Sequence, residues 1–492
     1  MNSQIIERNK FAILYLVILS AHLLVFMPLF YRFGYRWDEI LDFSGAATDT
    51  YIANGRWMQA GLRYILGEGV HPWTSPFLAC IILSGTLVMQ CKIFDWGSFY
   101  RNVAYGLLVV IMHQYAFVLQ YAHQSDTIAI GMLLATLAVR ELSFNSRSMS
   151  TVIACIYMCL AIATYQSLAL YIIGLLLILS IRKCAYGDNK NVFRIALKSA
   201  AALICASIMW KIGKSCSLMF INDETRMCYE HAQSCMSNSA GIMESPVGYV
   251  CHYTLLVLKR AFHPEYKLEV LYPLTLIGVA AIAMASLRLH VDKCSKGIIL
   301  VCTLGLWLLP FSMILALGNE WPCKPHTLLA EPIAFSGIWS IAADMYANQI
   351  KNKPKCKAIL LSVLLILLVR ASSSVSDIAK EERTLFERRA YNVNEMIREA
   401  DILVQNSKEA NRNLKYVYFN EETEYEYGSE DFTSSYPAWA KMRTARKADY
   451  DKHKTVVDHM PCWPREGSIR QNKGEIIIKG KNFGGTQEMN YM

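Results

Sequence analysis

The sequence predicts a mainly α-helical, polytopic membrane protein with about eleven transmembrane helices and a small C-terminal α/β domain. Hydrophobic residues make up 54% of the 492 residues, and the mean hydropathy is +0.24. Long apolar runs recur from Phe11 to Val369, and burying all of them without a bilayer would need an implausibly large soluble core. The placement of basic residues between these runs supports the same fold class independently.

Eleven segments are candidate spans, although several are shorter than the roughly 20 residues of a full crossing. They are residues 11–31, 76–94, 103–119, 127–139, 151–164, 168–181, 192–212, 268–287, 297–317, 327–345 and 358–369. The first segment follows Arg8 and Lys10, as a secretory signal would. It lacks a small-residue cleavage site and is long for a signal, which favours an uncleaved anchor.

Basic residues concentrate in every second loop, which is the positive-inside pattern. With a cytoplasmic amino terminus, the inside loops carry Lys92 and Arg101; Arg140 and Arg147; Arg182, Lys183, Lys190 and Arg194; Arg288, Lys293 and Lys296; and Lys351, Lys353, Lys355 and Lys357. The outside turns 120–126 and 165–167 contain no Lys or Arg, and 318–326 contains only Lys324. The net charge of +9 therefore follows from topology and a basic tail, and it does not indicate nucleic-acid binding.

The chain changes character after Arg370, where the apolar runs give way to a polar tail. Residues 1–371 are expected to form a transmembrane catalytic domain, with a first periplasmic loop at 32–75 and an outer loop at 213–267. Residues 372–492 are expected to form a periplasmic domain, because an odd number of spans places the tail opposite the amino terminus. An irregular apolar stripe predicts a helix at 378–405, and short β-rich runs predict strands at 415–419 and 474–479.

Six of the fifteen cysteines are expected on the oxidising side of the membrane. Cys228 and Cys235 lie seven residues apart in the outer loop, which favours a local disulfide. A zinc site that includes His231 is the alternative, but the spacing matches no strong zinc signature.

Three carboxylates, Asp38, Glu39 and Asp42, follow the first span by a few residues and indicate chemistry at the membrane surface. A sugar hydroxyl is a poor nucleophile at neutral pH, and a positioned carboxylate takes its proton as the hydroxyl attacks. The loop therefore supplies candidate general bases.

Residues 54–66 have the pattern of an amphipathic helix that lies flat at the membrane interface. Trp57, Leu62 and Ile65 belong to its apolar face, while Arg56 and Arg63 fall on the other face. Guanidinium groups there would stabilise a departing phosphate. Binding of bulk phospholipid headgroups is an equally good interpretation of the spacing alone.

Two further outside segments supply candidate substrate-binding residues. Tyr165 and Gln166 form a turn between two short spans, where a phenol and an amide would hydrogen-bond sugar hydroxyls, although a simple helix-hairpin turn explains the pattern equally well. Lys324 and His326 precede a later span and would help to bind a phosphate, while headgroup anchoring is the usual role of such residues.

Four features of the chain occur together in one known arrangement. They are Trp37-Asp38-Glu39, Asn54-Gly55-Arg56-Trp57, the Thr164-Tyr165-Gln166 break between two apolar half-runs, and a polar tail after the last span. This arrangement resembles the bacterial type II glucosyltransferases that modify O-antigen, which include phage-encoded serotype-converting enzymes and are similar to the wider GT-C class. The resemblance covers the layout of the whole chain, through motifs that are short and degenerate.

The resemblance implies an inner-membrane enzyme that moves a sugar, typically glucose, from a polyprenyl-phosphate donor to a hydroxyl of the lipopolysaccharide O-antigen on the periplasmic side. By analogy Asp38 is the general base, Glu39 a second carboxylate for the acceptor or a metal, and Arg56 the phosphate contact. Many members carry two aspartates here, so the choice of base between Asp38 and Glu39 stays open. The implied mechanism is a single displacement with inversion. Several GT-C enzymes use a divalent cation, and nothing in this sequence requires one.

The sequence also argues against several other classes of protein. It contains no Walker-type glycine loop, Rossmann fingerprint or HExxH motif, which disfavours an ATP-driven pump, a soluble-fold nucleotide-sugar enzyme and a zincin protease. A lipid-linked sugar transporter or flippase is the main alternative, and the scarcity of charges within spans argues against ion-coupled transport. An O-antigen polymerase is the second alternative, and it is expected to depend on large-loop arginines.

Overall fold

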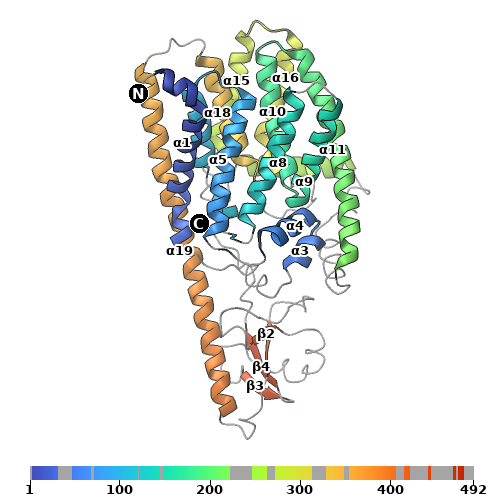
Figure 1. Cartoon of the computed structure of the whole chain (residues 1–492), viewed down its shortest axis with the longest axis vertical. Helices are drawn as coiled ribbons and strands as arrows, with labels where there is room; N and C mark the ends of the chain where they lie inside the picture. Colours follow the sequence, from blue (N-terminus) through green and yellow to red (C-terminus); the bar gives the residue numbers. More distant parts are fainter. Residues whose placement is uncertain are drawn as a thin grey trace.

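The computed structural model of the chain is a bundle of helices with a small sheet beyond one end (Figure 1). The structure describes residues 3–31, 47–67, 71, 73–112, 114–119, 121–122, 124–144, 148–221, 246–262, 272–312, 328–347, 354–405, 415–420, 442–444, 469–472 and 475–480. Several residues singled out above lie outside these ranges, and they are Asp38, Glu39, Asp42, Cys228, His231, Cys235, Lys324 and His326.

Seven of the described helices are long and apolar enough to cross a membrane. They are Asn9–Tyr31, Thr74–Phe94, Ser125–Phe144, Leu168–Ala185, Asn191–Phe220, Lys293–Phe311 and Ile359–Lys380, and shorter apolar helices are Phe99–Ile111, Met149–Thr164 and Tyr272–Arg288. The prediction of a polytopic α-helical membrane protein is confirmed. Large apolar side chains on the outer surface of these helices suit contact with lipid tails.

The bundle follows the expected order of segments, and a described helix overlaps each of the eleven. Its helices are α1 (Ser3–Tyr31), α5 (Thr74–Phe94), α6 (Phe99–Ile111), α7 (Gln114–Leu119), α8 (Ser125–Phe144), α9 (Ser148–Thr164), α10 (Leu168–Ala185), α11 (Asn189–Ser217), α14 (Pro246–Phe262), α15 (Thr275–Arg288), α16 (Lys293–Leu308), α18 (Glu331–Ala347) and α19 (Pro354–Gln405). Two short helices, α3 (Ala47–Ala53) and α4 (Trp57–Leu66), lie beside one end of the bundle (Figure 1).

Two segments differ from the sequence-based expectation. The span expected at 103–119 is divided, because α6 ends at Ile111 and α7 begins at Gln114. A helix, α14, occupies part of the outer loop expected at 213–267, and its buried Tyr253 and Val257 pack into the core of the bundle. Hydropathy alone missed α14 because its apolar side chains are interrupted by polar ones.

The two helices expected at 358–369 and 378–405 are one continuous helix, α19, of 52 residues. Neither Gly nor Pro follows Pro354 within it, so no residue breaks the backbone hydrogen bonding. Buried Leu364, Leu368, Ala371 and Val375 recur at spacings of four and three, and α19 packs along α1. At about 1.5 Å per residue α19 is about 78 Å long, and it extends well beyond the bundle (Figure 1).

Hydrogen bonds between buried side chains tie four helices together in the interior. The amide of Gln90 on α5 donates to the hydroxyl of Tyr171 on α10, at 2.5 Å, and to Thr136 on α8, at 3.3 Å. The hydroxyl of Tyr105 on α6 donates to the carbonyl of Gln90 at 2.7 Å. Apolar side chains can pack against lipid as well as against another helix, so these hydrogen bonds make the packing of the four helices specific.

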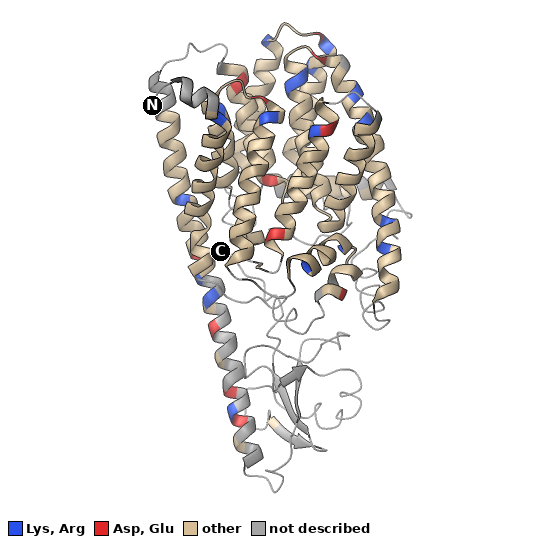
Figure 2. Ribbon diagram, viewed as in Figure 1, with Lys and Arg blue, Asp and Glu red and all other residues tan. Residues whose placement is uncertain are grey.

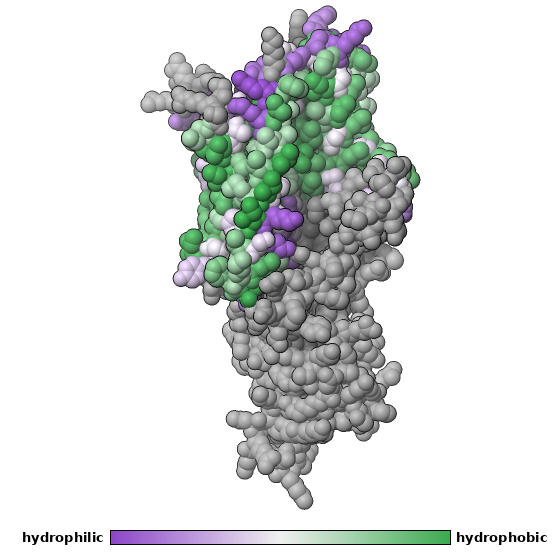
Figure 3. Space-filling model, turned by 90° about the vertical axis from the view of Figure 1, so that its right-hand side faces the viewer, coloured by the Kyte–Doolittle hydropathy of each residue, from purple (hydrophilic) through white to green (hydrophobic). Residues whose placement is uncertain are grey.

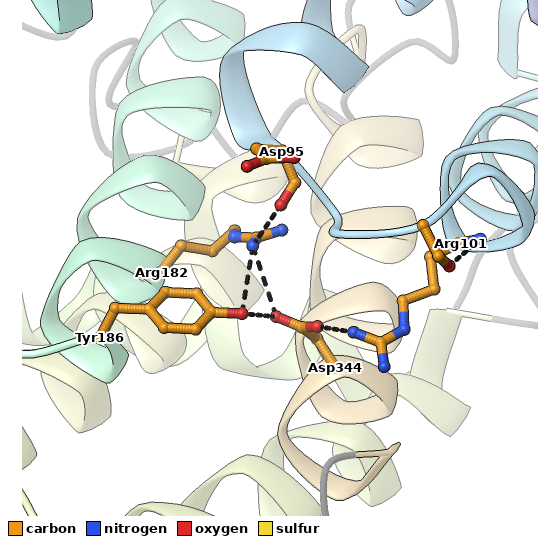
Figure 4. Close-up of polar contacts among 6 residues, drawn as sticks. Asp95, Arg101, Arg182, Tyr186 and Asp344 are labelled. Carbon is orange, nitrogen blue, oxygen red and sulfur yellow. Dashed lines mark hydrogen bonds and ion pairs between the residues drawn. The ribbon is translucent and has the colours of Figure 1, made fainter. Parts of the chain in front are cut away.

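An ionic network at the end of the bundle opposite α3 and α4 joins α6, α10 and α18 (Figure 4). The carboxylate of Asp344 on α18 pairs with Arg101 on α6, lies 3.5 Å from Arg182 on α10, and accepts a 2.9 Å hydrogen bond from Tyr186. Arg182 also donates to the backbone carbonyl of Asp95 at 2.6 Å. Because Arg182 and Asp344 are buried, this network fixes the packing of α10 against α18.

Charged residues of the described bundle gather mostly toward its two ends (Figure 2). The five that are fully buried lie in the first or last turns of their helices. They are Arg63, Asp126, Arg182, Glu331 and Asp344.

The described strands form a four-stranded sheet of order β2-β1-β4-β3. β1 (Lys415–Asn420) pairs in parallel with β2 (Met442–Thr444) and β4 (Glu475–Gly480), while β3 (Ile469–Asn472) is antiparallel to β4. β1 and β4 coincide with the two expected strands to within one residue. β3 packs against the far part of α19, so the long helix connects the sheet to the bundle.

Candidate active site

Three segments that are distant in the sequence meet at the end of the bundle where α3 and α4 lie. The turn Asn54-Gly55-Arg56 joins α3 to α4, and it packs against the turn Tyr165-Gln166 between α9 and α10 and against the last part of α11. The three expected site residues Arg56, Tyr165 and Gln166 are therefore neighbours.

The side chain of Arg56 is held by both residues of the α9–α10 turn. Its guanidinium carbon lies 4.4 Å from the centre of the Tyr165 ring, a stacked cation–π geometry. Its Nε donates to Oε1 of Gln166 over 3.4 Å, a long hydrogen bond, and Nε2 of Gln166 donates to the backbone carbonyl of Asn54 over 2.5 Å. The amide of Gln166 thus holds both the backbone of the turn and the cation that follows it.

Glycine at position 55 allows this close approach. Gly55 has φ +74°, a left-handed conformation that residues with a side chain rarely adopt. A Cβ atom there would lie 3.0 Å from the ring of Trp210 and 3.4 Å from Nε2 of Gln166. The indole N–H of Trp210 donates to the carbonyl of Gly55 over 2.8 Å, so α11 fixes the turn from a third side.

The orientation of α4 differs from the expected one. Its polar residues Gln59 and Arg63 are buried together with Leu62 of the apolar face, whereas Tyr64 and Ile65 are exposed. Arg63 forms an ion pair with Asp126 at the start of α8, and Gln59 donates to Gln124 over 3.4 Å. The expectation that Arg63 faces the membrane surface was wrong, because a buried carboxylate attracts its guanidinium inward.

Another carboxylate, Asp49 on α3, lies near this turn in the sequence. Burial raises the pKa of the Asp49 carboxyl above its usual value. Sequence reasoning passed over Asp49 because it is not next to a span, and it passed over Trp210 because it lies inside a long apolar run.

One known protein family matches most of the chain. A family described as Glucosyl transferase GtrII matches residues 26–341, well over half of the chain. The chain belongs to this family. A comparison with curated protein sequences gives no match.

Membership of the GtrII family makes the chain a membrane glycosyltransferase, an enzyme with a sugar donor and an acceptor. The match begins in α1 and ends in α18. It includes all the expected site residues, which are Asp38, Glu39, Asp42, Arg56, Arg63, Tyr165, Gln166, Lys324 and His326.

The hypothesis of a divalent cation concerns Asp38 and Glu39, which lie outside the described residues. Among the residues that the structure does describe, no group of three or more His, Cys, Asp and Glu side chains is placed to hold a metal ion. The described part of this GtrII site places the cation of Arg56 over the ring of Tyr165.

We expect Arg56→Lys to lower the rate of sugar transfer by about tenfold or more, and Arg56→Ala by about 10²–10³-fold. A lysine keeps the charge but loses the planar fork and the stacking on Tyr165. Transfer rates in membranes that contain equal amounts of each variant give the measurement. Arg140→Lys, at an exposed arginine of α8, is the control and should leave the rate unchanged. Full activity of Arg56→Ala would remove Arg56 from the site.

Proposed function

We propose that this GtrII-family enzyme transfers a sugar, glucose by its family, from a polyprenyl-phosphate donor to a hydroxyl of the lipopolysaccharide O-antigen. The reaction would take place on the periplasmic side of the bacterial inner membrane. The observation that carries the proposal is the fixed position of Arg56, which Tyr165 and Gln166 hold at the end of an apolar bundle. A cation there can meet a phosphate whose isoprenoid chain stays in the lipid.

The proposed chemistry is a single displacement at the anomeric carbon. The acceptor hydroxyl attacks, the carboxylate of Asp38 takes its proton, and the bond between the anomeric carbon and the phosphate oxygen breaks. The electron pair of that bond leaves on polyprenyl phosphate, so the phosphate gains a negative charge. Arg56 stabilises this charge, and the configuration of the sugar is inverted.

The carboxylates belong to the segment between Tyr31, the last residue of α1, and Ala47, the first residue of α3. In the proposal Glu39 assists the base or binds the acceptor, and Asp42 binds substrate. Lys324 and His326 would add contacts to the donor phosphate.

The described contacts suggest revised roles for three of the expected substrate-binding residues. Tyr165 and Gln166 would act by positioning Arg56, since their ring and amide already contact it. Arg63 would hold α4 against α8, since it is buried with Asp126. Of the two arginines in residues 54–66, Arg56 is therefore the one that would contact the phosphate of the sugar donor.

The proposed topology has eleven spans, a cytoplasmic amino terminus and a periplasmic α/β domain after α19. It is supported by the basic residues of the loops at the Asp344 end, which follow the positive-inside pattern. The end with α3 and α4 is then periplasmic.

A reporter that is active only in the periplasm should be on when it is fused after Gln405, the last residue of α19. The same reporter fused after Phe144, at the end of α8, should be off, because α8 ends at the opposite side of the membrane from the proposed site. If the reporter is off after Gln405 and on after Phe144, the topology is the reverse of the proposed one and the site faces the cytoplasm.

A lipid-linked sugar transporter or an O-antigen polymerase is the competing function. An ion-coupled transporter normally places charged residues within its spans, whereas the buried charges of the described residues lie at helix ends. This placement favours an enzyme. Mass and linkage analysis of lipopolysaccharide from cells with and without the chain tests the proposal. We expect one additional sugar on each O-antigen repeat, and identical repeats with a different chain length would instead indicate a polymerase.

A further inference from the structure

α11 carries two lysines near its last turns, Lys211 and Lys214, and Lys214 lies against Gly55 in the Asn54-Gly55-Arg56 turn. Under the proposed topology this end of α11 is periplasmic, where the positive-inside rule disfavours lysine. Figure 3 views the side of the bundle on which α11 lies, and hydrophilic side chains interrupt the apolar surface near its lower boundary. A cation in this position therefore calls for a specific explanation.

The two lysines point in different directions. Ile204, Ile208 and Ile212 are exposed and mark the lipid-facing side of α11, and Lys211 is exposed next to them. Lys214 is half-buried and shares a face with Trp210, one helical turn earlier. Because the indole of Trp210 bonds to Gly55, this face of α11 looks toward the candidate site.

Close packing holds Lys214 against the turn that carries Arg56. A Cβ atom on Gly55 would lie 3.1 Å from Cδ of Lys214, so the lysine stem crosses directly over this glycine. One residue before Lys214, a Cβ atom on Gly213 would lie 2.7 Å from the ring of Trp57. These two contacts place the end of α11 against Gly55 and Trp57, the two residues that flank Arg56 in the sequence.

We propose that Lys214 is a further cation for the phosphate of the lipid-linked donor, which it holds together with Arg56. This inference rests on the proposed function. A polyprenyl-phosphate sugar is a phosphodiester with one negative charge, and its leaving group is a phosphomonoester with up to two. One cation matches the donor, and the second matches the charge that develops as the carbon–oxygen bond breaks, so Lys214 acts mainly in the transition state.

The test compares Lys214→Gln with Lys211→Gln, a matched variant three residues away on the lipid-facing side. Transfer from a polyprenyl-phosphate sugar is measured in membranes with equal amounts of each full-length protein. We expect Lys214→Gln to lower kcat by about tenfold or more with a smaller change in KM, and Lys211→Gln to match the wild type. Lys214→Arg should retain most of the activity because it keeps the charge, which separates a loss of charge from a loss of folding.

A second measurement, binding of polyprenyl phosphate to the purified full-length protein, distinguishes failure of this inference from failure of the proposed function. If the wild type transfers no sugar from the lipid donor, the proposed function fails. If the wild type is active, the two glutamine variants decide the inference. An equal loss of activity and of polyprenyl-phosphate binding in both variants, or no loss in either, would make Lys214 only a headgroup contact and overturn the inference. Selective loss in Lys214→Gln supports it.

Discussion

Replacement of Asp38 by Asn is expected to abolish sugar transfer while the protein still inserts into the membrane. Asparagine has nearly the same shape as aspartate but accepts no proton at neutral pH, and a general base typically contributes about 10²–10⁴-fold to the rate. We therefore expect a fall of at least about 10²-fold in kcat. The measurement is transfer of a radiolabelled sugar in membranes with matched protein levels.

Glu39→Gln and Asp42→Asn are the matched controls for this prediction, because they remove carboxylates close to Asp38 in the sequence. Each should reduce transfer less than Asp38→Asn does. A normal rate for Asp38→Asn would remove Asp38 as the base, and a larger loss for Glu39→Gln would assign that role to Glu39.

Asp126→Asn is expected to destabilise the protein strongly. Arg63 and Asp126 are an ion pair whose side chains are 2% and 5% exposed, so the substitution leaves a buried guanidinium without its carboxylate. Breaking a buried ion pair from one side costs about 3–5 kcal/mol. The apparent melting temperature of the purified protein in detergent should fall accordingly, and α4 should lose its fixed position beside Arg56.

A double variant, Arg63→Met with Asp126→Leu, distinguishes the charge from the packing. Apolar residues of similar size often replace a buried ion pair without loss of stability, so the double variant should melt well above Asp126→Asn. Glu387→Gln is the control, since it breaks an exposed pair with Arg383 on α19 and should cost at most about 1 kcal/mol. An unchanged melting temperature for Asp126→Asn would show that the pair does not hold α4.

The spans were predictable because a bilayer demands long apolar runs, and that demand is local in sequence. The continuity of α19 was not, because the polar residues after Arg370 end the apolar run without ending the helix. The division between α6 and α7 was missed because only two polar residues, His113 and Gln114, interrupt the apolar run there.

The candidate site was predictable in its parts but not in its contacts. Arg56 stood out as a cation beside a membrane helix, and the Tyr165-Gln166 turn stood out as a polar break in an apolar run. Arg56 and Gln166 are hydrogen-bonded although they are 110 positions apart in the sequence. A local sequence pattern does not predict a contact over such a separation.

The inward position of Arg63 on α4 was missed for a different physical reason. An amphipathic pattern shows that a helix has two faces, but lipid and protein interior are both apolar, so the pattern does not tell which face lies inward. The partner of Arg63 decides the orientation, and Asp126 is a single residue in a distant turn.

The central claim is that this membrane enzyme breaks a sugar–phosphate bond of a lipid donor and forms a glycosidic bond. The most direct measurement incubates the purified full-length protein in liposomes with a polyprenyl-phosphate sugar, labelled in the sugar, and with a lipid-linked O-antigen acceptor. We predict that the label becomes covalently attached to the acceptor as an equal amount of polyprenyl phosphate is released. Movement of the intact labelled donor across the bilayer without a new glycosidic bond would contradict the account.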